Sequence, residues 1–273
     1  MKISIVGAGA LGMRVSARLS GAGEVLASTR TRERFAELEE AGATPVQADL
    51  AEPESLRPLL DADALLFCVA PGFGPGRDHI YGELLPRFAE QAAASSLTRL
   101  VFTSSTAVYE ELEGDGPVTE RTPARASSRR GLSLLEAEQA LADRLGERLV
   151  VLRPAGLYAR GRGPFHYLEE RLAAGEELSG AGDRRLNLIH YDDVAALAAE
   201  ALIKPGPALV LGADGRPGTR RERYGAFCRA RGYPEPRFAV ADGVEDVGKR
   251  IVPEAGFALR YPDFDAAIAA GAV

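Results

Sequence analysis

The chain begins with the feature that most constrains its fold, a glycine-rich turn between a strand-like run and an amphipathic segment. In MKISIVGAGALGMRVSARL, Gly7, Gly9 and Gly12 form the pattern GxGxxG after ISIV and before a helix expected near Ala10. Gly7 permits a tight turn, Gly9 lets the backbone approach a pyrophosphate, and Gly12 lets the helix pack on the strand. The helix N-terminus, with Ala10 and Leu11, would hold the phosphates. The pattern predicts a dinucleotide site, and a purely structural glycine turn is the alternative.

Short apolar runs alternate with helical patterns along the rest of the first two hundred residues. The further runs are 24–29, 44–50, 62–70, 99–105, 148–154 and 208–213. Strand-length runs separated by helices indicate βαβ units in a parallel sheet. Gly42 follows a helical segment at the place of a left-handed cap. The fold class we predict is α/β, a Rossmann-type doubly wound parallel sheet with a smaller C-terminal lobe for the substrate.

One of the expected helices, RRGLSLLEAEQALADRL at 129–145, has an apolar stripe at helical spacing. The stripe consists of Leu134, Ala137, Leu141 and Leu145. Such a stripe predicts a helix packed against the core.

The regular alternation loosens after about residue 154, where Gly and Pro become frequent. We therefore expect a dinucleotide-binding domain of residues 1–157 plus 187–212, and a lobe of residues 158–186 plus 213–273. The segment LNLIHYDDVAALAAEAL reads as a strand and a helix that return to the main domain. Open α/β sheets bind ligands outside the carboxyl ends of their strands, so the lobe would cover the site.

Charge and composition narrow the classes of partner. The 273 residues include 39 acids and 33 lysines and arginines, a net charge of −6, with both signs interspersed. This pattern argues against nucleic acid or an anionic membrane as a partner. No run approaches the roughly 18 apolar residues of a membrane span. The two cysteines show no CxxC spacing, which predicts a reduced, cytoplasmic protein.

Other site chemistries find little support in the sequence. His166 and His190 lack metal-ligand spacing, so no metal site is expected. There is also no GxSxG elbow of the kind that hydrolases use.

The second predicted strand ends in arginines where an NAD-binding protein usually has an acid. Between Glu24 and Glu33 there is no acid, and Arg30 and Arg32 occupy the place. A guanidinium can pair with a 2′-phosphate through two hydrogen bonds, so NADP is favoured and NAD stays open. The alternative is that both arginines are solvated. Further cofactor contacts are expected at the next two strand ends, from Asp49, Leu50, Ala70 and Pro71.

Five segments in order carry a resemblance to a known family. GAGALG, VQADL, FTSSTAVY, LRPAGLY and LIHYDDVA resemble the extended short-chain dehydrogenase/reductase superfamily, the NAD-dependent epimerase/dehydratase group. The tail GKRIVPEAGFALRYPDFDAAI is similar to its atypical, YeeZ-like members. The resemblance implies a Rossmann domain, a substrate lobe and a catalytic Ser/Thr, Tyr and Lys. Cofactor contacts are then expected from Thr103, Ser104 and Pro154, and pairing through helices in that family leaves a homodimer open.

Two members of that catalytic trio are missing. The family hydroxyl lies four residues before Tyr109, which makes it Ser105. The Tyr and Lys of YxxxK should follow about twenty residues later, but Arg130 and Leu134 stand there, and no lysine occurs between residues 3 and 203. In the family, Tyr moves the proton that accompanies hydride transfer and Lys lowers the pKa of that Tyr. A positioned general acid or base contributes on the order of a hundred- to ten-thousand-fold in rate.

Few side chains are available as substitutes. Arg130 stays protonated, so it could stabilise an oxyanion, or it could be a solvated helix entrance. The phenol of Tyr158 could move a proton, or it could be structural or line the substrate site. Arg160 and Arg162 could bind an anionic substrate group. His190 could contact substrate, although the family's HxxD segment mostly helps to dock the lobe.

The sequence therefore predicts an NADP-preferring protein of the epimerase/dehydratase type. As an enzyme it would reduce, oxidise or epimerise a small polar or nucleotide-linked substrate, with Ser105, Arg130 and Tyr158 as catalytic candidates. The alternative is a catalytically silent NADP(H) sensor. The missing Tyr and Lys favour the sensor, whereas the retained TSSTAVY segment and the lobe favour the enzyme.

Overall fold

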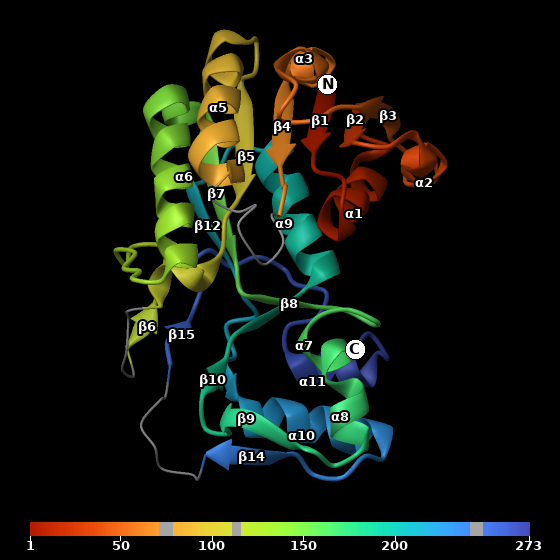
Figure 1. The fold of residues 1–273 in the computed structure, drawn as a ribbon, viewed down its shortest axis with the longest axis vertical. Coiled ribbons are helices and arrows are strands. Elements are labelled where there is room, and N and C mark those ends of the chain that lie inside the picture. The colour runs from red at the N-terminus through yellow and green to blue at the C-terminus, as the bar shows by residue number, and fades with distance from the viewer. Residues whose placement is uncertain (71–78, 111–115, 241–247) are drawn as a thin grey trace. The chain divides into compact units, whose positions relative to one another are not determined.

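The computed structural model describes residues 1–70, 79–110, 116–240 and 248–273 (Figure 1). Within these ranges, seven strands form one central sheet in the order β12–β7–β5–β4–β1–β2–β3. The strands are β1 (Lys2–Val6), β2 (Glu24–Thr29), β3 (Thr44–Gln47), β4 (Ala64–Phe67), β5 (Arg99–Thr103), β7 (Leu149–Pro154) and β12 (Leu209–Gly212).

The strand order creates a switch point beside β1. From β3 to β7 each neighbouring pair is parallel; Ile3, for example, lies beside Val25 of β2 and beside Ala64 of β4. The chain first runs outward from β1 through β2 and β3, then crosses to β4 and continues outward on the other side. The predicted Rossmann-type doubly wound sheet is confirmed. In such sheets a dinucleotide binds at the switch point, outside the carboxyl ends of the strands.

Helices connect these strands as the periodicity predicts. They are α1 (Ala10–Leu19), α2 (Phe35–Glu40), α3 (Arg57–Leu60), α5 (Leu85–Ala94), α6 (Arg129–Leu145) and α9 (Tyr191–Ile203). Short helical turns cover η1 (Arg32–Arg34), η2 (Pro53–Leu56), η3 (His79–Leu84), η4 (Thr106–Tyr109) and η5 (Gly146–Arg148). Gly42 has the expected left-handed conformation, with φ 76°.

The helix α6 has the predicted limits and the predicted buried stripe. Ser128 caps its N-terminus by accepting a 3.1 Å hydrogen bond from the Gly131 N–H. Leu134, Ala137 and Leu141 are at most 2% exposed. Helices α5 and α6 lie side by side (Figure 1).

The described residues fall into two compact units. The first comprises residues 1–108, 127–153 and 194–210, and the second comprises 109–126, 154–193 and 211–273. The boundaries expected from the sequence remain a prediction, and they differ mainly in segment 109–126, which belongs to the second unit.

The second unit contains short strand pairs and helices around an aromatic core. Its elements are β6 (Pro117–Val118), β8 (Gly156–Tyr158), α7 (Pro164–Tyr167), α8 (Glu169–Ala173), β9 (Glu177–Ala181), β10 (Arg185–Leu186), β11 (Leu188–His190), β13 (Gly218–Thr219), α10 (Arg220–Arg231), β14 (Arg237–Val240), β15 (Arg250–Ile251) and α11 (Phe264–Ala269). At its centre Phe165 and Phe264 stack with ring centroids 4.5 Å apart. Thr219 and Glu222 form a capping box at the start of α10.

Candidate functional site

The glycine turn after β1 has two crowded glycines and one open glycine. Gly7 has φ 95°, and a Cβ there would lie 2.7 Å from the Val69 amide nitrogen. A Cβ on Gly12 would lie 2.9 Å from the Gly7 carbonyl oxygen. A Cβ on Gly9, by contrast, would meet no described atom within 4 Å. Gly7 and Gly12 are thus required by the fold, whereas Gly9 leaves space outside the backbone.

The electrostatics of this turn suit an anion. Helix α1 starts directly after Gly9, with no side-chain cap and no acid in its first turn. Its first N–H groups and the positive end of its dipole therefore face a ligand position. Ser28 of β2 holds the turn by accepting the Gly7 N–H at 2.9 Å. Burial raises the pKa of the Cys68 thiol to about 12, so this neighbour stays neutral beside the turn.

Arg30 and Arg32 follow β2, and both are exposed. The Arg32 Nε donates to Gln47 Oε1 at 3.0 Å, and Gln47 Nε2 donates to the Arg30 carbonyl at 3.2 Å. These bonds connect the ends of β2 and β3. Arg32 is partly occupied by this contact, which makes Arg30 the better candidate for a ligand phosphate. Glu33 lies just beyond, and hydrogen bonds from its own backbone and from Thr31 lower its pKa.

The ends of β3 and β4 carry the remaining predicted contacts on this side. Asp49 is half-buried, and its Oδ1 accepts the Ala51 N–H at 2.9 Å, so that this oxygen closes a turn. Leu50 beside it is also half-buried, and Ala70 after β4 is exposed. Pro71 lies outside the described residues.

Three consecutive hydroxyl residues lie at the carboxyl end of β5, which stops at the first of them, Thr103. The Thr103 Oγ1 is buried and has no hydrogen-bond partner among the described residues. Ser104 is 7% exposed and donates to Glu138 Oε1 of α6 at 2.5 Å. Ser105 is half-buried, and its Oγ accepts the Ala107 N–H at 3.1 Å. The end of β5 therefore carries one buried, unpartnered hydroxyl and one half-buried hydroxyl that can still donate a hydrogen.

Glu138 and Arg153 are polar residues of this region that the sequence analysis missed. Arg153 of β7 donates through Nε to Glu138 Oε1 at 3.0 Å and through Nη2 to Oε2 at 2.5 Å. Both side chains are 10% exposed. The sequence did hold a sign of this pair: Glu138 interrupts the apolar stripe of α6, and Arg153 interrupts the apolar run that forms β7. Pro154, a predicted cofactor contact, follows as the buried last residue of β7.

The positions of the expected Tyr and Lys lie in the first two turns of α6. Arg130 is exposed there, next to the Ser128 cap. Leu134 is 2% exposed and packs in the core. An exposed guanidinium could meet a ligand, whereas the Leu134 side chain can offer only apolar contact.

Tyr158 lies inside the second unit. Its side chain has no exposure, its ring contacts Phe165, His190 and Phe264, and its Oη has no hydrogen-bond partner among the described residues. Burial and, to a smaller extent, the nearby Asp214 raise the pKa of this phenol above its usual range. This environment favours the structural alternative for Tyr158.

His190 and Asp193 hold the C-terminal segment of the same unit. The His190 Nε2 lies 3.2 Å from the Ala272 carbonyl, and its Nδ1 accepts the backbone N–H two residues later. The Asp193 carboxylate accepts the N–H groups of Arg260 and Tyr261 at 2.6 and 3.1 Å. The imidazole is 4% exposed, which favours a structural role over substrate contact.

Arg160 and Arg162 lie in a tight turn of the second unit, and both are exposed. Arg160 borders a hollow of about 210 Å³ whose lining includes Phe227 and Arg231. The guanidinium groups of Arg160 and Arg231 beside apolar side chains suit the anionic group predicted for Arg160 and Arg162, although Arg162 is not part of this lining.

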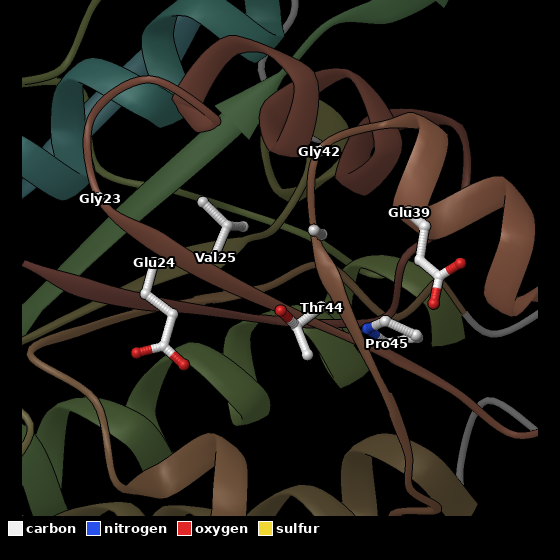
Figure 2. A pocket seen from close by; sticks show the side chains of 8 residues that line it. Gly23, Glu24, Val25, Glu39, Gly42, Thr44 and Pro45 are labelled. Carbon is white, nitrogen blue, oxygen red and sulfur yellow. The ribbon is translucent and has the colours of Figure 1, made fainter.

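A larger hollow of about 380 Å³ lies elsewhere in the first unit (Figure 2). It is bordered by the first residues of β2 and β3, including Glu24 and Thr44, and by Glu39. The glycine turn follows the carboxyl end of β1, so this hollow lies at the opposite ends of the parallel strands. Its two carboxylates would repel phosphates, and it is not the dinucleotide site.

The part of the chain that the structure describes contains neither a metal-binding cluster nor a membrane-spanning helix. No group of three or more His, Cys, Asp or Glu could hold a metal ion there. Nor does any helix in the described ranges have the length and apolar character to cross a membrane.

The fold and the glycine turn define a class, a protein with a Rossmann-type dinucleotide-binding sheet. The family model described as NAD(P)H-binding matches residues 7–205, and the chain belongs to this family. It is 31% identical to Protein YeeZ of Escherichia coli strain K12, over 96% of this chain and 97% of that protein.

Solved structures share the fold at low sequence identity. UDP-glucose 4-epimerase from Thermotoga maritima, solved with UDP-glucose, has a TM-score of 0.81, 19% identity and 98% coverage of both chains. WbmH of Bordetella bronchiseptica, solved with NAD+, has a TM-score of 0.77 and 20% identity, with coverage of 98% of this chain and 96% of that chain.

Proposed function

We propose that the protein binds NADP(H) along the carboxyl ends of the central strands, with the pyrophosphate at the start of α1. Gly9 carries this proposal. Its φ of −81° is open to any residue, and a Cβ would meet no described atom within 4 Å, so neither backbone conformation nor packing demands a glycine. The missing side chain does make room for a ligand against the backbone, next to uncapped N–H groups.

The same proposal assigns the 2′-phosphate to Arg30, with Arg32 in support. Two observations support this assignment: the Arg30 side chain is exposed at the end of β2, and no acid occurs between Glu24 and Glu33 to repel a phosphate. Thr103, whose buried hydroxyl has no hydrogen-bond partner among the described residues, is proposed as a contact of the other half of the dinucleotide. When bound, the nicotinamide accepts or supplies a hydride.

As an enzyme, the protein would act as an oxidoreductase or epimerase on a small polar or nucleotide-linked substrate. The likeness to an epimerase solved with UDP-glucose supports this substrate class. Ser105 would bind the reacting oxygen, because its Oγ accepts the Ala107 N–H and its hydrogen stays available to donate. Arg130 would stabilise developing negative charge without donating a proton. We assign Tyr158 to packing, because its phenol is fully buried.

A sensor that binds NADP(H) without turnover is the second candidate. It is favoured by Leu134, which packs in the core where the family resemblance calls for a lysine. No lysine occurs anywhere between residues 3 and 203, so no ammonium from this range can replace the missing one.

Titration calorimetry with NADP+ and NAD+ tests the cofactor proposal. We expect NADP+ to bind more tightly, and Arg30→Ala to weaken NADP+ about tenfold, the equivalent of one charge-assisted hydrogen-bonded pair. NAD+ affinity should change less than about twofold. Arg34→Ala is the matched control, because Arg34 is paired with Glu37 in the same segment. Tighter binding of NAD+ than of NADP+ would contradict the preference.

Two assays with a panel of polar ketones and nucleotide-linked sugars separate the enzyme from the sensor: NADPH consumption detects a reductase, and chromatography of the sugars detects an epimerase, which consumes no NADPH overall. Ser105→Ala should abolish any turnover while leaving NADPH affinity nearly unchanged. Ser96→Ala, an exposed serine before β5, is the control. Turnover that survives Ser105→Ala would remove Ser105 from the chemistry, and tight binding with no turnover of any substrate would support the sensor.

A further inference from the structure

A buried network of three residues links α6 to the ends of β5 and β7. Ser104 donates to Glu138 Oε1, and Arg153 donates to both oxygens of the same carboxylate. Glu138 and Arg153 are 10% exposed and Ser104 is 7% exposed. All three residues belong to the first unit. We call these residues the Ser104–Glu138–Arg153 network.

Both oxygens of the Glu138 carboxylate are hydrogen-bonded within the network. Oε1 accepts two hydrogen bonds and Oε2 accepts one from the same guanidinium, in the two-pronged geometry that Arg and carboxylate favour. A buried carboxylate is costly unless its partners are in place, so each member holds the other two in position.

The network fixes the strand end that carries the Thr103 and Ser105 hydroxyls. The Ser104 side chain is held by α6, and its backbone N–H donates to the Leu152 carbonyl of β7 at 2.8 Å. Ser104 is thus held from two sides, and it lies between Thr103 and Ser105. Any shift of its backbone would move both neighbouring hydroxyls.

The place of Glu138 on α6 gives this link its importance. Positions four residues apart lie on one face of a helix, and Arg130, Leu134 and Glu138 are spaced in this way. The first two positions hold no Tyr and no Lys. The third position, Glu138, accepts a hydrogen bond from Ser104 and so links this face of α6 to the end of β5.

The network lies on one side of the switch point. β5 and β7 belong to the β4 side of the sheet, whereas Arg30 follows β2 on the other side. Each half of a doubly wound sheet binds one mononucleotide of a dinucleotide, and the residue after the second strand contacts the adenosine ribose. The network should then act on the nicotinamide half alone.

We infer that Glu138 is a positioning residue that, through Ser104, orders the end of β5 for the nicotinamide half of the cofactor. This inference rests on the proposed binding of NADP(H). It separates two functions along the sheet: the glycine turn and Arg30 hold the adenosine side, and the Ser104–Glu138–Arg153 network shapes the reacting side.

Calorimetry with two ligands, NADPH and 2′,5′-ADP, tests the inference, because 2′,5′-ADP lacks the nicotinamide half. We expect Glu138→Gln to weaken NADPH about tenfold, the loss of one buried charged hydrogen bond, and to change 2′,5′-ADP affinity less than about twofold. The control, Glu136→Gln, alters an exposed acid on the same helix and should change neither.

Ser104→Ala provides a second variant that leaves the Glu138–Arg153 pair intact. It should give the same selective loss, and the double variant should lose no more than Glu138→Gln alone, because both act through one link. A merely structural role would weaken both ligands in parallel or neither, and either outcome overturns the inference. If the unaltered protein binds both 2′,5′-ADP and NADPH, the proposed function holds and the variants test the inference alone. If the unaltered protein binds neither ligand, both the proposed function and the inference are wrong.

Discussion

Two buried acids, Glu138 in the first unit and Asp214 in the second, are hydrogen-bonded to different extents. In the first unit, the Glu138 carboxylate has every oxygen bonded, to Ser104 and to Arg153. In the second unit, Tyr158 Oη and Asp214 Oδ2 are buried without a hydrogen-bond partner among the described residues. Buried polar groups stabilise a unique arrangement only when they are satisfied. The comparison teaches that the paired Glu138 carboxylate can fix its surroundings, whereas the incompletely bonded Asp214 carboxylate is kept at a cost in stability.

Breaking the satisfied network should have the largest effect. Arg153→Ala would leave the Glu138 carboxylate buried with no cation, and removal of one partner of a buried pair costs roughly 3–5 kcal/mol. Denaturant unfolding followed by circular dichroism would measure this loss. Arg144→Ala removes an exposed partner of Glu90 and should cost less than about 1 kcal/mol. Similar losses in both variants would mean that the buried network contributes no special stability.

Placing a new charge beside the network should have an intermediate effect. Leu134 lies one helical turn before Glu138 and is 2% exposed. Leu134→Lys removes a buried apolar side chain and adds an ammonium that competes with Arg153 for the carboxylate. We expect a loss of roughly 2–4 kcal/mol in the free energy of unfolding, with no gain of NADPH turnover. Arg130→Tyr, at an exposed position, should change stability by less than about 0.5 kcal/mol.

A stable Leu134→Lys variant would overturn this expectation. It would show that the core beside Glu138 accepts a lysine, and that the fold does not resist the residue that the family resemblance leads one to expect.

Removing the unsatisfied charge of the second unit should have the smallest effect, and of opposite sign. Burial, as the largest cause, raises the pKa of Asp214 to about 6, while the Arg216 N–H and Arg223 act against it. A carboxyl whose folded pKa is raised stabilises the fold below its unfolded pKa of about 4, and loses that contribution as pH rises through about 6. Asp214→Asn should therefore stabilise the protein at pH 7 by about 1 kcal/mol, after allowance for partial exposure.

Unfolding of both proteins at several pH values would check this. The stability difference between Asp214→Asn and the unaltered protein should be small near pH 4 and should grow up to pH 7. Asp265→Asn, at an exposed position, should give no such trend. A variant that is less stable than the original at pH 7 would show that the ionised Asp214 is well accommodated.

Local patterns in the sequence predicted much of the first unit. The expected helix at 129–145 is α6, the expected strand at 24–29 is β2, and the turn at Gly7 has the conformation that its motif requires. The third strand was expected at 44–50 but ends at Gln47, because Asp49 closes a turn with the Ala51 N–H. A side chain that bonds its own backbone competes with the strand, and periodicity alone does not reveal it.

The sequence by itself determined the alternation of strands and helices, the glycine turn and the missing Tyr and Lys, because each depends on neighbouring residues or on helical spacing. Only the tertiary structure decided that Ser104 meets Glu138, 34 residues away, and that Glu138 meets Arg153. It also decided that Tyr158 has no exposure. Pairing and burial of this kind depend on which elements the topology brings together, and no local pattern encodes that choice.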